Sequence, residues 1–180
     1  MQDNRRDPHY DGRHATLTRF QAATEAVLNP SSPLAKGQPI RFGFCVGHLR
    51  LLLMPHTFSE VIPQAVIYPL PNVPPWFLGV LNQRGNLLPV FDLHQLLRAR
   101  NRGHDNHTVL VLDQGSDAVG MLIDGMPQAV TLTRTQGQVP ALSQALKAYV
   151  PAAYRAGDTV WLEFDHQAFF TATGAQITRA

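Results

Sequence analysis

An all-β fold, either a barrel or a sandwich, is the fold class that this sequence predicts. Most apolar residues fall in short runs that glycine and proline turns separate, a pattern typical of small β folds. The first run, residues 40–46, alternates Ile40, Phe42, Phe44 and Val46 with other residues, as a half-buried strand does. Later runs are joined in pairs by short loops that contain glycine, which indicates hairpins.

The first strands follow from this alternation. Residues 40–46 and 49–54 are expected as two strands, with a tight turn at Gly47 between them. Residues 58–62 form a further short segment. The stretch 68–75 is punctuated by prolines and is therefore expected as a loop.

A central hairpin is predicted next. Residues 79–83 and 87–91 are two apolar runs on either side of the tripeptide 84–86. A three-residue loop is expected, because Gly85 takes positive φ at no steric cost. Pro89 lies inside the second run and has no N–H to donate, so its position is expected at an edge or a bulge.

Further strands and two capped helical turns are expected after the hairpin. They are a helical turn after Asp92, strands at 108–112 and 118–123, a strand at 127–132, strands at 149–154 and 159–164, and a helical turn after Asp165. The two aspartates are suited to accept hydrogen bonds from the first N–H groups of a helix. Residues 136–143 are assigned to no element.

The sequence contains a weak internal repeat. GNLLPVFDLHQLL, from Gly85, and GDTVWLEFDHQAFF, from Gly157, share a turn glycine, an apolar strand, Phe-Asp, His-Gln and an apolar helical turn. Two similar units suggest two related barrel halves. The hint is limited, because aspartate caps many junctions between a strand and a helix.

The composition is that of a globular protein with a core. The 180 residues are 44% hydrophobic and 16% charged, unlike a disordered acidic or basic chain. The net charge of +2 is small and scattered. Since no run is rich in lysine or arginine, a nucleic-acid partner is not expected.

The sequence also indicates a cytoplasmic protein. Cys45 is the single cysteine, which excludes an internal disulfide and suits a reducing compartment. The N-terminus is polar and lacks the apolar stretch of a signal peptide. No apolar run approaches the roughly 20 residues that span a bilayer, so direct membrane insertion is not expected.

Two segments are predicted along the chain. Residues 1–38 are an N-terminal extension, and residues 39–175 are the β domain. Within the extension, residues 15–28 can form an amphipathic helix that ends at Asn29-Pro30. A helix of this length is marginal alone, so it is expected to dock either on the domain or on a partner.

No group of residues indicates catalysis. His94, His104 and His107 lie near Asp92 and Asp105 in the sequence, but their spacing matches no motif of metal ligands. The sequence also lacks a nucleophile elbow and a glycine-rich phosphate loop. No catalytic residue, metal or cofactor is therefore expected, and a metal-dependent enzyme is the weakest functional hypothesis.

Arg84 is the strongest candidate for a binding residue. The predicted hairpin carries it at the tip, in front of an apolar wall, as in many binding hot spots; the alternative is a solvated turn arginine. If residues 58–62 lie beside the hairpin, Glu60 could accept a bidentate bond from Arg84. Such an exposed pair contributes only about 0.2–1 kcal/mol, so its use would be to fix the shape of the tip.

The same region resembles a known family. WFLGVLNQRGNLLPVFDL, residues 76–93, resembles the signature of CheW-like proteins, the coupling proteins of bacterial chemosensory arrays. With YPLPNVPPW just ahead, it is most similar to the PilI-type variant of pilus-based twitching systems. The resemblance extends over residues 39–173 and includes Ile123-Asp124-Gly125.

The resemblance implies a fold and a function. The fold would be two intertwined five-stranded SH3-like β-barrels around a shared apolar core, here with short helices and the N-terminal extension. Such proteins have no catalytic activity. They couple the cytoplasmic tips of chemoreceptors to a CheA-type histidine kinase, whose regulatory domain has the same fold. A stand-alone binding module of this fold for another protein partner is the second hypothesis.

The resemblance also implies a partner-binding set. A receptor tip would lie in a groove near Phe58, Glu60, Gly79 and Arg84. Asn82 and Gly85 belong to the signature motif. The set comprises Phe58, Glu60, Gly79, Asn82, Arg84 and Gly85. In the family, an acidic residue and an arginine at the positions of Glu60 and Arg84 form a surface pair tied to kinase control.

Overall fold

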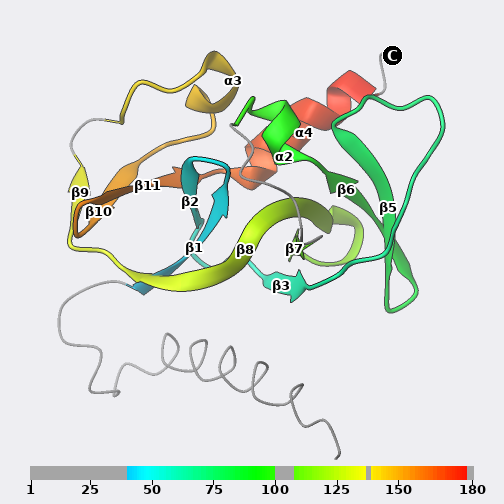
Figure 1. Cartoon of the computed structure of the whole chain (residues 1–180), viewed down its shortest axis with the longest axis horizontal. Helices are drawn as coiled ribbons and strands as arrows, with labels where there is room; N and C mark the ends of the chain where they lie inside the picture. The colour runs from blue at the N-terminus through cyan, green and yellow to red at the C-terminus, as the bar shows by residue number, and fades with distance from the viewer. Residues whose placement is uncertain (1–39, 100–107, 137–138, 178–180) are drawn as a thin grey trace, which may run out of the picture. The chain divides into compact units, whose positions relative to one another are not determined.

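A computed structural model gives the structure of the chain and describes residues 40–99, 108–136 and 139–177. The predicted extension at 1–38 and its helix lie outside the described residues. Strands dominate the described part, which confirms the all-β fold class (Figure 1).

The described residues form eleven strands and a few short helical segments. The strands are β1 (Ile40–Val46), β2 (Leu49–Leu53), β3 (Ser59–Ile62), β4 (Ile67–Tyr68), β5 (Phe77–Gln83), β6 (Asn86–Phe91), β7 (Thr108–Leu112), β8 (Val119–Thr131), β9 (Arg134–Gln136), β10 (Ala153–Ala156) and β11 (Thr159–Phe164). The helices are α2 (Leu93–Leu96), the 3-10 turn η2 (Gly115–Asp117), α3 (Gln144–Lys147) and α4 (His166–Ile177).

The strands fall into two groups that share β8. Group A contains β1, β2, β9, β10 and β11, and group B contains β3 to β7. The chain begins in group A, passes through group B and returns through β8, which runs across both in Figure 1. This path pairs β6 with β8 and β2 with β11 in parallel, while the other pairings are antiparallel. The two groups are therefore intertwined, as the family resemblance implies.

The long strand β8 differs from the prediction. Two strands, at 118–123 and 127–132, were expected with a break at Asp124-Gly125, but β8 is continuous through that point. Gly125 takes a φ of +66°, and the register with β1 shifts there, from Asp124 opposite Cys45 to Gln128 opposite Gly43. Asp124-Gly125 therefore forms a β-bulge and not a turn. The bulge bends β8, which stays paired with β7 before it and with β1 after it.

Other elements are also corrected. β4 was not predicted: Tyr68 begins the stretch 68–75 that was expected as a loop, but Ile67 and Tyr68 both pair with β5. β9 and α3 were not predicted at all. The strand predicted at 149–154 begins only at Ala153, since Tyr149 closes a turn after α3 and its ring packs on Phe169 with centroids 5.1 Å apart.

The central hairpin has a shorter loop than expected. Gln83 pairs with Asn86, so only Arg84 and Gly85 form the loop, and both have positive φ, +53° and +90°. This geometry is that of a two-residue hairpin turn of the I′ kind. Pro89 conforms to its prediction, because the parallel ladder of β6 with β8 begins only at Val90.

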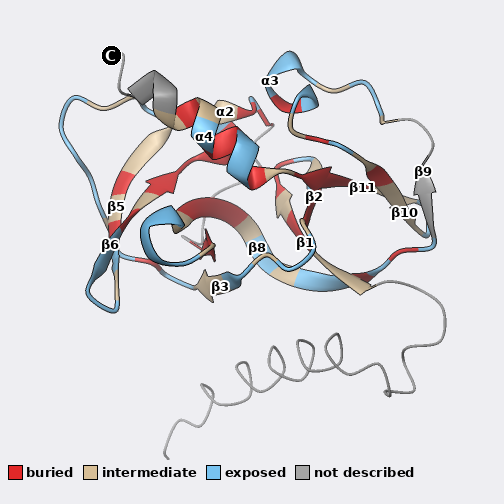
Figure 2. Cartoon of the chain, turned by 180° about the vertical axis from the view of Figure 1, so that it is seen from behind, coloured by how far each residue is buried: buried red, intermediate tan, exposed pale blue. Residues whose placement is uncertain are grey.

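The apolar core is shared by the two groups. Its largest cluster combines Phe44 and Leu51 of group A with Leu110 of group B and Met121 of β8, all at most 1% exposed. Figure 2 shows buried stretches along β6, β8, β11 and one side of α4. α4 follows group A, yet its Phe170 ring lies 4.8 Å from that of Phe91 in group B. A core common to both groups therefore holds them together.

Candidate functional site

The tip of the β5–β6 hairpin is held in one shape by short-range contacts. The Gly85 N–H donates to Asn82 Oδ1 over 3.0 Å, which closes the loop from inside. Arg84 and Gly85 are both exposed. Because the flanking residues Gln83 and Asn86 are paired in the ladder, the tip is a rigid projection of the sheet.

Glu60 on β3 accepts two bonds from this tip. Arg84 Nη2 donates to its Oε1 over 3.0 Å, and Gln83 Nε2 donates to its Oε2 over 2.9 Å. The predicted contact between Glu60 and Arg84 is present, but it is not bidentate, because Gln83 takes the second oxygen. The Arg84 side chain remains 77% exposed against 30% for Glu60, so the guanidinium presents most of its surface to solvent.

The other members of the predicted set lie differently. Phe58 is 43% exposed and directly precedes β3, where its carbonyl accepts from the Asp113 N–H over 3.0 Å. Gly79 is buried, with a φ of +130°, and a Cβ there would lie 2.1 Å from the Tyr68 carbonyl oxygen. Gly79 therefore acts by letting β4 approach β5 closely, while Phe58, Glu60 and Arg84 present side-chain surface.

The backbone of Arg84 is also informative. A positive φ places the Cβ of a non-glycine residue in a crowded conformation, and asparagine or glycine is preferred at this position of a two-residue loop. Arg84 occupies it at +53°. Turn chemistry therefore gives no reason for arginine here, and strained residues of this kind cluster at functional sites.

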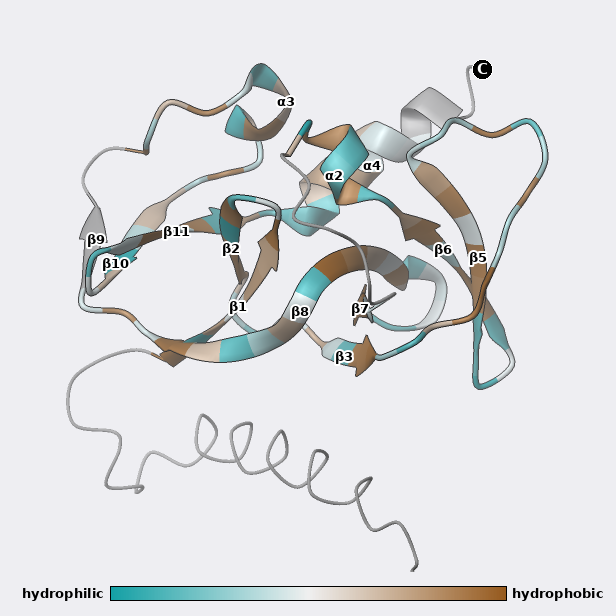
Figure 3. Ribbon diagram, viewed as in Figure 1, coloured by the Kyte–Doolittle hydropathy of each residue, from teal (hydrophilic) through white to brown (hydrophobic). Residues whose placement is uncertain are grey.

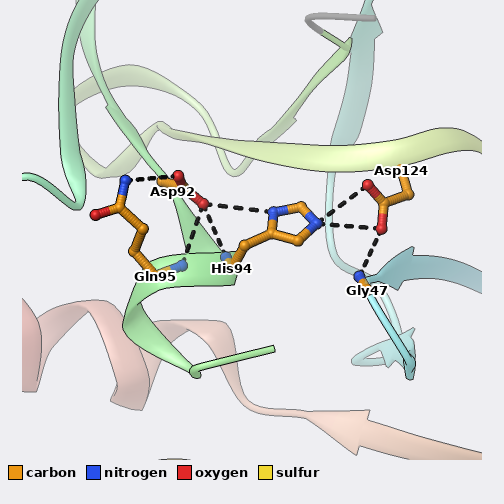
Figure 4. A network of polar contacts seen from close by, with 5 residues as sticks. All are labelled: Gly47, Asp92, His94, Gln95 and Asp124. Atoms are coloured by element: carbon orange, nitrogen blue, oxygen red, sulfur yellow. Dashed lines mark hydrogen bonds and ion pairs between the residues drawn. The ribbon is translucent and has the colours of Figure 1, made fainter. Parts of the chain in front are cut away.

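The contacts of two buried histidines were missed by reasoning from the sequence, which considered His94 only as a metal ligand. Figure 4 shows the first: His94 Nε2 lies 3.1 Å from both carboxylate oxygens of Asp124, and its Nδ1 lies 3.4 Å from Asp92 Oδ1. Asp124 also accepts from the Gly47 N–H. Asp92 caps α2 as predicted, with His94 N and Gln95 N as donors.

His166, the second histidine, makes the reciprocal contact, from the end of group A to group B. His166 Nε2 lies 2.9 Å from Asp113 Oδ2, and His166 is 2% exposed. His94 follows group B in the chain and is linked to the β1–β2 turn of group A through Asp124. His166 follows group A in the chain and contacts Asp113, at the end of β7 in group B. The contacts of Asp124 with His94 and of Asp113 with His166 are thus ties between the groups. The internal repeat Phe-Asp followed by His-Gln could have pointed to the two histidines, but not to their aspartate partners.

Comparisons with known proteins settle the family. The family model described as CheW-like domain matches residues 42–173. The chain belongs to the CheW-like domain family. The match spans β3, the β5–β6 hairpin and both His–Asp ties.

Individual relatives agree with this assignment. The chain is similar to "Chemotaxis protein CheW" of Klebsiella aerogenes (35% identity; 36% of this chain, 40% of the relative) and to "Protein FrzA" of Myxococcus xanthus (38%; 35% and 41%). It thus spans about two fifths of the length of these relatives. A chemotaxis protein CheW of Rhizobium meliloti is 26% identical over 59% of this chain and 70% of its own.

A solved structure shows the same fold. The scaffolding protein TtCheW of Thermoanaerobacter tengcongensis superposes with a TM-score of 0.60 over 71% of this chain and 89% of its own, at 17% identity. This likeness confirms, at the level of fold, the mainly-β SH3-like architecture that the family resemblance implies.

Two further findings concern the CheW-like domain itself. Within the described ranges, no three histidine, cysteine, aspartate or glutamate residues are placed to hold a metal ion; His104, Asp105 and His107 lie outside those ranges. None of the helices in the described part is both long and apolar enough to cross a membrane.

Proposed function

We propose that this protein is a non-enzymatic adaptor that couples the cytoplasmic tips of chemoreceptors to a CheA-type histidine kinase. The observation that carries the proposal is the Arg84–Glu60 pair, held at a rigid hairpin tip within a CheW-like domain. The names of two matched relatives and of the matched structure, chemotaxis and scaffolding proteins, support the same role.

The hairpin tip would receive the receptor. A helical receptor tip would contact Phe58 and the exposed guanidinium of Arg84, with Glu60 holding the arginine in place. Asn82 and Gly85 set the loop that carries Arg84, and Gly79 sets the position of the adjacent strand. Each interface in such an assembly is modest in area, so several linked contacts in an array would supply the strength of the coupling.

The setting of this adaptor is part of the proposal. Residues 39–175 form the coupling domain and residues 1–38 an extension to it. The protein acts in the cytoplasm, and the wording of residues 68–76 favours a pilus-based twitching system over a flagellar one.

The test is a reconstitution of kinase control with purified receptor fragment, kinase and adaptor. Arg84→Ala should fold normally and lose receptor co-sedimentation and receptor-dependent kinase control. Arg50→Ala is the matched control, because Arg50 is also an exposed arginine but lies on β2, away from the hairpin loop. Wild-type coupling by Arg84→Ala would contradict the proposed site, and a wild-type protein that binds neither partner would favour a binding module for another protein.

A further inference from the structure

Polar side chains gather at the tip of the β5–β6 hairpin. In Figure 3, hydrophobic colours run along β5 and much of β6 and give way to hydrophilic colours at this tip. Gln83 is the last residue of β5 and directly precedes Arg84. Its side chain reaches β3, where Nε2 donates to Glu60 Oε2 over 2.9 Å. Arg84 therefore shares its acceptor, Glu60, with the residue before it in the chain.

This shared acceptor determines how Arg84 is held. A guanidinium and a carboxylate alone favour two parallel N–H···O bonds. Here Glu60 accepts from Arg84 Nη2 through Oε1, over 3.0 Å, while Oε2 is occupied by the Gln83 amide. A guanidinium carries five N–H groups, and the Arg84 side chain stays 77% exposed. A single bond thus orients Arg84 and leaves most of its donors facing solvent.

The two bonds to Glu60 lie in different surroundings. The Gln83 bond is partly buried, whereas the Arg84 bond is exposed. Water and salt screen an exposed ion pair, which shifts an equilibrium by no more than about fivefold. A partner can therefore draw Arg84 away from Glu60 at little cost. The Glu60 carboxylate then keeps its Gln83 bond, so it is not left without a donor, which would be unfavourable for a group only 30% exposed.

The neutrality of the Gln83 side chain matters as well. An amide donates a hydrogen bond without adding charge, so Glu60 keeps its negative charge and still attracts Arg84. Arg84 is the single charged residue in the sequence 62–91, so no other charge in that stretch competes for Glu60. The result is an arginine whose position is set by Glu60 and whose remaining donors are open to a partner.

We propose that Gln83 is a positioning residue for receptor binding. By holding one oxygen of Glu60, it keeps the Arg84–Glu60 pair to a single bond and leaves the guanidinium open to the receptor tip. The inference rests on the proposed adaptor function, and it adds a residue that lies outside the predicted partner-binding set. It also gives the pair a property that is measurable without the receptor, namely the mobility of the Arg84 guanidinium.

The first test measures binding of the full chain to the purified receptor fragment. Methionine is about as long as glutamine and has no N–H to donate, so Gln83→Met frees Oε2 and allows Arg84 to bind both oxygens of Glu60. Receptor affinity should fall about three- to fivefold, since one further exposed ion-pair bond must be broken. Gln95→Met is the matched control, because Gln95 Nε2 also donates to a carboxylate, Asp92 Oδ2, over 2.9 Å, but in α2. The control should bind the receptor fragment like wild type, and unfolding midpoints should show that both variants are folded.

The second test measures the Arg84 side chain directly. NMR relaxation of its Nε–H group, assigned with Arg84→Lys, reports the motion of the guanidinium on the picosecond-to-nanosecond timescale. In Gln83→Met two bonds should hold the guanidinium, so its order should rise relative to wild type, and in Gln95→Met it should stay unchanged. Unchanged or greater mobility in Gln83→Met would overturn the proposal.

A double-mutant cycle separates positioning from packing. If Gln83 acts through Glu60, Gln83→Met should weaken receptor binding in the wild-type background and have no further effect in a Glu60→Ala background. An equal loss of affinity in both backgrounds would show that Gln83 acts through packing of the hairpin, against the proposal.

The remaining outcomes separate this inference from the adaptor function. If the wild-type chain binds the receptor fragment and Gln83→Met binds it equally well, Gln83 has no positioning role and the adaptor function stands. If the wild-type chain does not bind the receptor fragment, the adaptor function itself fails, and the role of Gln83 in receptor binding fails with it.

Discussion

His94 Nε2 lies 3.1 Å from each carboxylate oxygen of Asp124, and the two residues are separated by 30 positions in the chain. The histidine lies in the first turn of α2, the helix after group B. The aspartate lies at the bend of β8 and accepts from the Gly47 N–H of group A. His166 and Asp113 make the reciprocal connection. These side-chain ties therefore connect the two groups in addition to the shared strand β8 and the shared core.

Removal of the first tie should destabilise the domain. Asp124→Ala leaves the buried His94 ring and the Gly47 N–H without this acceptor, so the free energy of unfolding should fall by about 2 kcal/mol. Denaturant unfolding followed by circular dichroism measures the change. Asp117→Ala is the control, because Asp117 is exposed on the neighbouring η2 turn, and it should stay within about 0.5 kcal/mol of wild type. Equal stability of the two variants would show that the tie is not structural.

The features that the sequence predicted are the ones that depend on neighbouring residues. The hairpin around Gly85, the cap at Asp92 and the strand at 40–46 follow from local patterns, and the structure contains all three. β4 was missed because the prolines that follow it indicated a loop, whereas pairing with β5 decided its conformation. The pair His166–Asp113 spans 53 positions, and no local pattern reports a contact at that separation.

The candidate site shows the same division. Arg84 at a hairpin tip was predicted from the loop sequence, and its contact with Glu60 was predicted with the help of the family resemblance. The role of Gln83 as the second donor to Glu60 was not predicted, because it depends on the position of β3 beside the tip. The length of the loop was wrong by one residue, since the pairing of Asn86 with Gln83 could not be read from turn composition alone.

A buried ion pair offers a direct comparison with the surface pair at the hairpin tip. Arg41 Nη2 lies 2.7 Å from Glu163 Oε1, with side chains only 15% and 9% exposed, and the guanidinium lies 5.8 Å from the centre of the Tyr154 ring. Glu163→Ala leaves the arginine buried without its counter-charge, so it should lower the free energy of unfolding by about 3–5 kcal/mol. Glu60→Ala removes a partner of an exposed arginine and should lower it by less than about 1 kcal/mol. Urea unfolding of both variants measures the difference, and similar losses would contradict the burial argument.

Gly79 should be among the least replaceable residues of the domain. An alanine Cβ there would lie 2.1 Å from the Tyr68 carbonyl oxygen, in a backbone with a φ of +130°. Gly79→Ala should therefore cost about 3 kcal/mol or more, since the backbone of β4 must move. Gly125→Ala is the control, because its φ is also positive but no atom lies within 4 Å; it should cost only about 1–2 kcal/mol. Thermal unfolding measures the loss of stability in both variants, and the difference between them is the steric cost of the Cβ at position 79. Equal losses would show that the close approach of β4 to Gly79 does not limit this position.

Arg84→Asn separates the stability of the hairpin from its function. Asparagine followed by glycine is the preferred pair in a two-residue loop with two positive φ angles, and Arg84 precedes Gly85 at a φ of +53°. The substitution should therefore raise the free energy of unfolding by about 0.5 kcal/mol, even though the bond to Glu60 is lost. The same variant should lose receptor co-sedimentation and kinase control, because the exposed guanidinium is gone. Arg84→Lys keeps the charge and the strained backbone, and comparison of the two shows whether charge alone is sufficient. If Arg84→Asn is more stable but loses receptor binding and kinase control, arginine serves binding at this position and lowers the stability of the turn. If Arg84→Asn keeps full kinase control, Arg84 is an ordinary solvated turn residue.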